Sequence, residues 1–140
     1  MKTKIYAKVN HIDDLHFTGE NKTGVKIDMD SRPAGELSAG PSPMELVLQA
    51  AGGCTSMDVV FILKKRKIIP KRFEVELVGV KREEHPRVYE SVNMTFRAKG
   101  EGVTIAEMDR AVALSLKSYC AVFGMLKSTA EVNWKCELID

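Results

Sequence analysis

Alternation of apolar and polar residues predicts strands at the start, in the middle and at the end of the chain. GVKIDMD (24–30) alternates strictly, and together with KIYAKV it predicts a short antiparallel meander within the first thirty residues. FEVELVGV (73–80) and RVYESVNMTFRA (87–98) are predicted strands joined by a polar turn. AEVNWKCELI (130–139) predicts a last strand, and its alternation places Cys136 on the apolar face.

A long apolar stretch over residues 44–63 predicts a helix that runs to about Lys67. Ser42 as N-cap, Pro43 at the first helical position and Glu45 at capping-box spacing mark its start. The helix is apolar nearly all round, which predicts burial on most sides. Its length would suit a membrane span, but its internal charges and paired glycines argue against one, so no membrane partner is expected.

A second helix is predicted to begin at Thr104, with Glu107 repeating the capping box, and to continue through Cys120 until Gly124 breaks it. The order of strands and helices predicts an α+β fold, with helices on one side of an antiparallel sheet and residues 1–140 as a single domain. One chain of this size has difficulty covering a helix that is apolar all round. We therefore expect an obligate homodimer.

Composition and charge narrow the possible partners. Twenty-one Lys and Arg oppose nineteen Asp and Glu, and the basic residues are scattered except for KKRK (64–67). A nucleic-acid partner is therefore not expected. The first residues, MKTKIYAKVNHIDD, are charged and contain no apolar segment of the kind that directs secretion, which predicts a cytoplasmic protein.

The three cysteines lie far apart, without the spacing of a metal site and without a cluster of histidines, so no metal is expected. Each of them is either an inert core thiol or a reactive thiol, and Cys136 fits the core. Gly52 and Gly53 directly precede Cys54 inside the first helix, where each glycine costs roughly 1 kcal/mol relative to alanine. The candidate reasons for the pair are close packing and access to Cys54.

Two motifs carry a family resemblance: SPMELVLQAAGGCTSMDVV (42–60) and SLKSYCAVFGML (115–126). They resemble the OsmC/Ohr family of osmotically induced and organic hydroperoxide resistance proteins, and the likeness spans nearly the whole chain. The resemblance implies an OsmC-like fold and an intertwined homodimer with the long helices at its centre. It also implies a peroxidatic cysteine at Cys54 and a resolving cysteine at Cys120.

The chemistry implied by the resemblance is the reduction of an organic hydroperoxide. A thiolate attacks the O–O bond and becomes a sulfenic acid, which condenses with the second thiol to a disulfide. A dithiol reductant of the lipoyl type then reopens the disulfide, and no metal or bound organic cofactor is required. In this setting Gly53, which lacks a side chain, gives an elongated peroxide access to Cys54.

The sequence departs from the family pattern in the residues that support the cysteine. Peroxidatic members have a glutamate ten residues before it, where this chain has Met44, and they pair that glutamate with an arginine from an N-terminal loop. HFTGENKTG offers Lys22 instead, and the one arginine before the helix is Arg32. Glu45 falls roughly opposite Cys54 on a helix and is better explained as the capping partner of its N-cap.

Two functional hypotheses follow. In the first, the chain is a thiol-dependent peroxidase for organic hydroperoxides, with Met44, Gly53, Lys22 and Arg32 around the cysteines as supporting residues. In the second, an OsmC-like protein without peroxidase activity binds a small apolar or thiol-bearing ligand in the cleft between two chains. The pair of cysteines favours the first hypothesis, and the missing glutamate and arginine favour the second.

Overall fold

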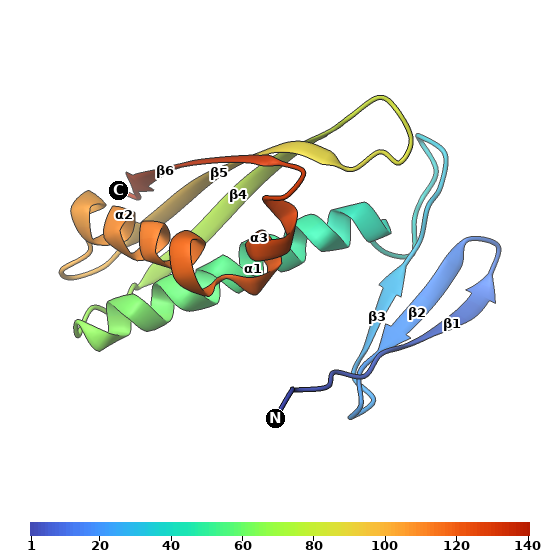
Figure 1. Ribbon diagram of the computed structural model, residues 1–140, viewed down its shortest axis with the longest axis horizontal. Coiled ribbons are helices and arrows are strands. Elements are labelled where there is room, and N and C mark those ends of the chain that lie inside the picture. Colours follow the sequence, from blue (N-terminus) through green and yellow to red (C-terminus); the bar gives the residue numbers. More distant parts are fainter. The chain divides into compact units, whose positions relative to one another are not determined.

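The computed structural model describes all 140 residues and has the predicted mixture of helices and strands (Figure 1). Its contacts divide the chain into two compact units, Met1–Val47 and Leu48–Asp140. Each unit contains a three-stranded sheet, so the strands belong to two sheets. The α+β class is confirmed.

The sheet of the first unit is the predicted meander. Strands β1 (Lys8–Asp13), β2 (His16–Glu20) and β3 (Lys26–Met29) pair antiparallel in sequence order. A bulge lies in the β1–β2 pairing next to Asp14, which adopts a positive φ of 44° in the turn. The meander was predicted, but β1 begins later than KIYAKV, and β2 lies in HFTGENKTG, which was not predicted as a strand.

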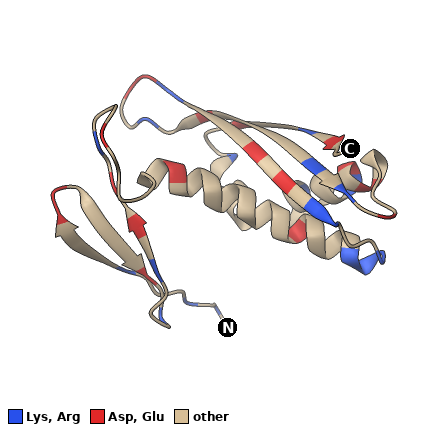
Figure 2. Cartoon of the chain, turned by 180° about the vertical axis from the view of Figure 1, so that it is seen from behind, with Lys and Arg blue, Asp and Glu red and all other residues tan.

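Helix α1 (Pro43–Lys65) begins at the predicted capping box. The Ser42 N–H donates to Glu45 Oε1 at 2.9 Å, and the Glu45 N–H donates to Ser42 Oγ at 3.2 Å. The helix ends with Lys67 in the left-handed region at φ 64°, while the Ile68 N–H bonds back to the Leu63 carbonyl at 2.9 Å. Blue positions gather at this end of α1 in Figure 2.

The second unit contains β4 (Arg72–Lys81), β5 (Tyr89–Lys99) and β6 (Glu131–Leu138) in that order. Strands β4 and β5 are antiparallel, but β5 and β6 are parallel, so the prediction of an antiparallel sheet was wrong for the last strand. The cause is the connection between β5 and β6, which contains helices and carries the chain back to the other end of the sheet. The helices lie on one face of this sheet (Figures 1 and 2).

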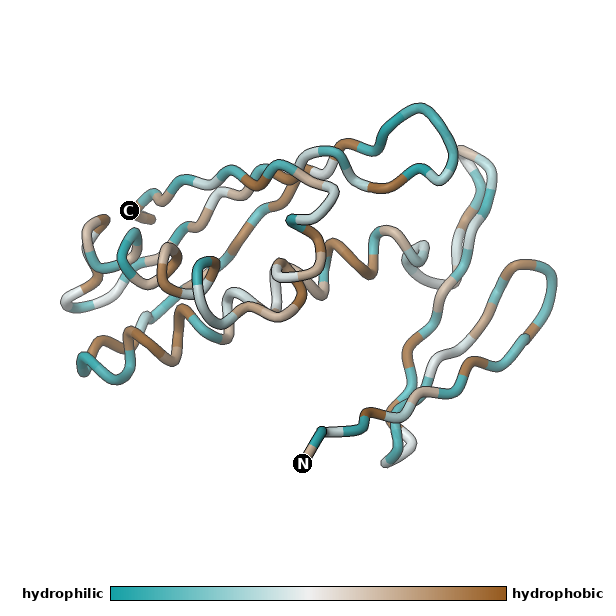
Figure 3. The backbone as a smooth tube through the Cα atoms, viewed as in Figure 1, coloured by the Kyte–Doolittle hydropathy of each residue, from teal (hydrophilic) through white to brown (hydrophobic).

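One face of α1 packs on the sheet of the second unit. Ala51, Thr55, Val59 and Leu63 recur at helical spacing and are fully buried. The opposite face stays open: the exposed fraction of Met57 is 76%. Figure 3 shows apolar positions along the whole helix, and the chain alone does not bury it on most sides as predicted.

Helix α1 is long and apolar enough to cross a membrane by length and composition alone. The helix at the core of a soluble protein passes the same test, so the finding is weak evidence. The buried side chains of this helix are small or branched, as in a helix packed on protein.

The predicted second helix is divided into three pieces. Helix α2 (Ile105–Leu114) passes into a π-helical turn, η1 (Ser115–Tyr119), and a short helix α3 (Ala121–Leu126) follows. Cys120, between η1 and α3, has extended backbone angles of φ −69° and ψ 104°. The continuous helix was therefore a wrong prediction, and Gly124 lies inside α3 and does not end it.

Only half of the predicted capping box forms at the start of α2. Thr104 Oγ1 accepts the Glu107 N–H at 3.1 Å. The Glu107 carboxylate does not return to Thr104 but accepts two hydrogen bonds from the Arg66 guanidinium, both at 2.7 Å. This bidentate pair ties the start of α2 to the residue that follows α1.

Candidate functional site

The two cysteines of the predicted pair meet in the second unit. Cys54 lies on α1, and Cys120 follows η1 directly. The Cys54 side chain contributes to the raised pKa of Cys120, so the two side chains lie near each other. Two residues far apart in the sequence are thus brought close together by the fold.

The π-helical turn sets the position of Cys120. The Cys120 N–H donates to the Ser115 carbonyl at 2.8 Å, which closes a five-residue turn in place of the usual four. The chain then leaves helical geometry at Cys120 and re-enters it, with the Gly124 N–H bonding to the Cys120 carbonyl at 2.9 Å. Single π turns of this kind inside helices are frequent at functional sites.

A chain of hydrogen bonds runs beside the cysteines. Ser115 Oγ donates to Asp58 Oδ2 at 2.7 Å, and Thr55 Oγ1 lies 2.9 Å from the same Ser115 oxygen. A serine hydroxyl has a single hydrogen to donate, so the Thr55 hydroxyl is the donor to Ser115. These hydrogen bonds join α1 to the π-helical turn. Thr55 directly follows Cys54, and the Ser115 carbonyl accepts the Cys120 N–H.

The environment of Cys120 favours the protonated thiol. Burial raises its pKa to about 11, the Cys54 side chain and the Asp58 charge add to the rise, and the backbone N–H of Phe123 opposes it. The exposed fraction of Cys120 is only 5%, whereas Cys54 is half-buried. A molecule from solvent therefore reaches Cys54 more readily than Cys120.

The paired glycines have different surroundings. A Cβ on Gly52 would lie 2.6 Å from Leu77 Cδ1, so its absence lets α1 approach strand β4. Close packing, one of the two predicted reasons for the glycine pair, is therefore found at Gly52, against this strand. A Cβ on Gly53 would meet nothing within 4 Å, which leaves the surface beside Cys54 open in the chain.

The third cysteine, Cys136, is not part of this pair. It is half-buried on β6, and burial, followed by a hydrogen bond with Asp109, raises its pKa to about 12. A thiol with so high a pKa is a weak nucleophile near neutral pH. These surroundings fit the prediction that Cys136 is a core residue.

The remaining predicted site residues belong to the first unit. Met44 is half-buried in the first turn of α1, and Lys22 is exposed between β2 and β3. Arg32 is engaged within its own unit: its Nε donates to Asp30 Oδ2 at 2.9 Å and its Nη1 to Asp14 Oδ2 at 3.0 Å. The structure thus gives the Arg32 guanidinium local carboxylate partners.

Glu45 behaves as a capping residue. The Ser42 N–H that donates to its carboxylate lowers the pKa of Glu45, and the side chain is exposed. No group of three or more His, Cys, Asp or Glu side chains is arranged to hold a metal ion.

Asp58 and Ser115 did not figure among the predicted site residues. Asp58 was visible in the sequence as a charge inside an otherwise apolar helix, one turn beyond Cys54, and that is the signal that could have found it. Ser115 carries no comparable signal, because only the folded chain shows its hydroxyl between Thr55 and Asp58.

Comparison with known proteins gives concordant results. Residues 34–135 match the family described as OsmC-like protein. The protein YhfA of Escherichia coli K12 is 38% identical over 133 residues, which cover 95% of this chain and 97% of YhfA.

Solved structures agree with this family at the level of the fold. An OsmC-like protein from Mycoplasma pneumoniae superimposes with a TM-score of 0.85 at 15% identity, covering 100% of both chains. The organic hydroperoxide resistance protein OsmC of Legionella pneumophila gives a TM-score of 0.71 at 14% identity, covering 96% of this chain and 97% of the other. By its sequence match to the family and to YhfA, and by this shared fold, the chain belongs to the OsmC-like protein family.

Proposed function

We propose that the protein is a thiol-dependent peroxidase that reduces organic hydroperoxides. The Cys54 thiolate attacks the terminal oxygen of the hydroperoxide, the O–O bond breaks, and the alkoxide leaves and takes up a proton to become an alcohol. Cys54 is then a sulfenic acid. The Cys120 sulfur attacks the Cys54 sulfur, a disulfide forms, and hydroxide leaves as water with the proton lost by Cys120.

The observation that carries this proposal is that the Cys54 and Cys120 side chains lie near each other. A core thiol has no need of a second thiol beside it, whereas a peroxidatic thiol needs one to form the disulfide. The Legionella pneumophila protein that shares the fold is described as an organic hydroperoxide resistance protein, which agrees with this chemistry. A dithiol of the lipoyl type would reopen the disulfide in a cytoplasmic setting.

The assignment of roles rests on exposure. Cys54 is half-buried beside the open position of Gly53, and Cys120 is buried with a raised pKa. The first thiol can therefore meet a substrate, and the second needs only to reach the sulfenic acid that forms next to it.

A ligand-binding protein without peroxidase activity is the second candidate. Met44 supplies no carboxylate at the position where peroxidatic relatives carry glutamate, and Arg32 already pairs with Asp30 and Asp14. If fast attack on a hydroperoxide requires that glutamate and its arginine, Cys54 reacts slowly, and ligand binding is the main role of the protein.

The two functions differ in how fast free thiols disappear. For the reduced protein mixed with cumene hydroperoxide in a stopped-flow instrument, we expect loss of two thiols per chain, faster than with hydrogen peroxide because the surroundings of Cys54 on α1 are apolar. Thiols that stay free under millimolar cumene hydroperoxide would contradict the peroxidase proposal and favour ligand binding.

We further propose that two chains form a homodimer through α1. Met57, Val60 and Phe61 are apolar, and Met57 and Phe61 are largely exposed on this helix. Burying a large apolar side chain is worth about 1.5–3 kcal/mol, so a second copy gains by covering this face. Sedimentation at micromolar concentration should show a dimer, and a folded monomer there would contradict the proposal.

A further inference from the structure

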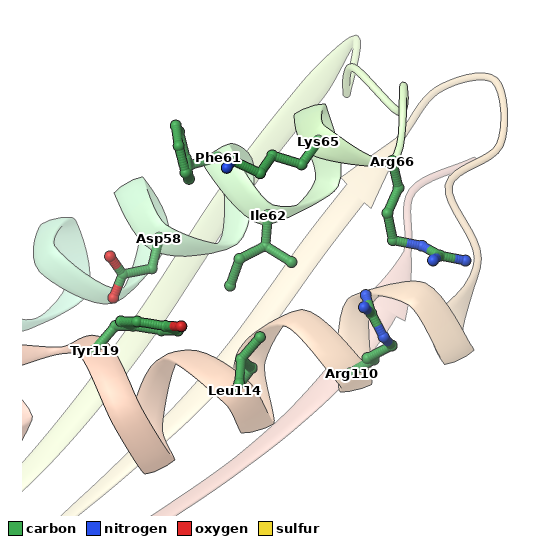
Figure 4. A pocket seen from close by; sticks show the side chains of 8 residues that line it. All are labelled: Asp58, Phe61, Ile62, Lys65, Arg66, Arg110, Leu114 and Tyr119. Atoms are coloured by element: carbon green, nitrogen blue, oxygen red, sulfur yellow. The ribbon is translucent and has the colours of Figure 1, made fainter.

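A groove of about 280 Å³ lies in the second unit, between the edge strand β6 and the segment that runs from the π-helical turn into α3. It is separate from the larger hollow between α1 and α2 that Figure 4 shows, to which Phe61 of the proposed dimer face contributes. No residue of α1 lines the groove at β6, so the proposed dimer contact uses none of its residues.

The apolar part of this groove contains an accessible aromatic ring. Leu116 of the π-helical turn, Phe123 of α3, and Val132 and Trp134 of β6 line it. Phe123 is buried, whereas Trp134 is half-buried and keeps part of its surface open to a ligand. An accessible indole favours a planar aromatic ligand, because stacked rings gain more than the burial of an aliphatic group of the same size.

Two lysines complete the lining, Lys117 of the π-helical turn and Lys127 at the end of α3. Both are exposed, and neither ammonium group forms an ion pair. No aspartate or glutamate lines the groove, and Asp109 of α2 interacts with Cys136 instead. A lysine side chain is long and rotatable, so an unpaired ammonium group can turn toward an anion bound in the groove.

The glutamates of β6 do not neutralise these two charges. Glu131 accepts a hydrogen bond from the Asn133 side chain at 3.3 Å. Glu137 lies 3.7 Å from the Lys135 ammonium group. Alternation along the strand places these four residues on the face opposite Trp134. The groove therefore combines an aromatic surface with uncompensated positive charge.

We propose that this groove binds a planar aromatic acid, with the ring against Trp134 and the anionic group held by Lys117 and Lys127. The volume is at the lower limit of small-molecule pockets, which suits a ligand of one or two fused rings. This binding is independent of peroxide chemistry and of the cysteine pair, so it goes beyond the proposed function.

Isothermal titration calorimetry with three ligands of similar shape tests the proposal. The reduced protein should bind naphthoate, and added salt should weaken this binding because the lysines are exposed. Naphthylmethylammonium, which has the same ring system and a positive charge, should not bind. Decahydronaphthoate, which keeps the charge but loses the flat ring, should bind about fivefold more weakly.

The results that would overturn the proposal follow from the same titrations. Absence of naphthoate binding, or equal binding of naphthylmethylammonium, would overturn it as a whole. Equal binding of decahydronaphthoate would overturn the preference for an aromatic ring.

The single tryptophan of the chain gives a direct test of location, because its indole N–H produces one signal in a proton–nitrogen correlation spectrum. Naphthoate should shift this signal along the saturation curve that calorimetry measures, since the ring current of the ligand acts on the indole beside it. An indole signal that stays in place at saturation would overturn the proposed site.

Lysine variants assign the contacts to the anionic group. Lys117→Gln and Lys127→Gln should each weaken naphthoate binding by roughly two- to fivefold, the effect of an exposed charge pair, and the double variant should weaken it further. Lys135→Gln is the matched control, because it removes the same charge next to Trp134 but on the opposite face of β6. Wild-type affinity in the double variant, or an equal loss in Lys135→Gln, would overturn the assignment of the anion to this groove.

Discussion

Cys54→Ser should abolish the reaction of the protein with organic hydroperoxide. A serine hydroxyl does not attack a peroxide under these conditions, and Cys120 is too deeply buried to replace the lost thiol. We expect the rate of thiol loss to fall roughly a thousandfold or more, which corresponds to about 4 kcal/mol or more in the activation free energy. Quenched-flow alkylation of free thiols after one equivalent of cumene hydroperoxide measures this rate.

Two further variants serve as controls for Cys54→Ser. Cys136→Ser should react like the wild type, because Cys136 is a half-buried thiol of raised pKa on β6. Cys120→Ser should still react once but stop at the sulfenic acid, and excess peroxide should carry it to the sulfinic acid. A folded Cys54→Ser variant that consumes hydroperoxide at the wild-type rate would show that another thiol is the nucleophile.

Formation of the disulfide should accelerate steeply as the pH rises. The resolving step needs the Cys120 thiolate, and burial raises the pKa of Cys120 to about 11. Burial is the largest cause and remains after Cys54 is oxidised. A raised pKa means that more of the thiol is protonated at a given pH, so the thiolate fraction and the rate should grow about tenfold per pH unit below this value.

The pH dependence can be assigned to the resolving step by measuring the two steps apart. In Cys120→Ser, formation of the sulfenic acid proceeds without resolution and reports the first step at each pH. In the wild type, alkylation at timed intervals after a stoichiometric pulse of peroxide reports the disulfide. A resolving rate that does not change with pH would contradict direct ionisation into solvent and would indicate a proton acceptor in the site, for which Asp58 is the nearest candidate.

Local sequence signals predicted the start of helix α1 correctly but not its end. Its start was predictable because Ser42 and Glu45 satisfy each other's backbone N–H groups within one turn of chain. Its end was predicted two residues late, because the cap is formed by Lys67 in a left-handed conformation that side chains rarely adopt and that the sequence does not signal.

The break at Cys120 could not be predicted from local pattern. The residues around it remain apolar at helical spacing, and no glycine or proline marks the π-helical turn. Ser115 is fixed from outside its own helix, by hydrogen bonds to Thr55 and Asp58 of α1. The π-helical turn therefore occurs where α1 contacts Ser115, although the local sequence favours a regular α-helix there.

The direction of the last strand and the capping of α2 also depend on contacts that local sequence patterns do not show. Alternation predicts that β6 is a strand, but its direction beside β5 depends on the path of the helices between them. Glu107 stands at the capping-box position, yet Arg66 binds it with two hydrogen bonds, and that partner becomes visible only in the folded chain.

The candidate site was accessible from the sequence to the extent that the family resemblance pairs Cys54 with Cys120. Composition and spacing alone left each cysteine as either a core thiol or a reactive one. The hydrogen-bonded residues beside the pair depend on the approach of α1 and the π-helical turn, which no local motif encodes.

Peptide mass spectrometry of the wild-type protein tests most directly whether Cys54 and Cys120 form a redox pair. The reduced protein is treated with one equivalent of cumene hydroperoxide, its remaining thiols are alkylated, and the digest is searched for disulfide-linked peptides. We predict one disulfide, between Cys54 and Cys120 of the same chain, with Cys136 alkylated. Recovery of all three cysteines as alkylated thiols, or a disulfide that includes Cys136, would contradict the account.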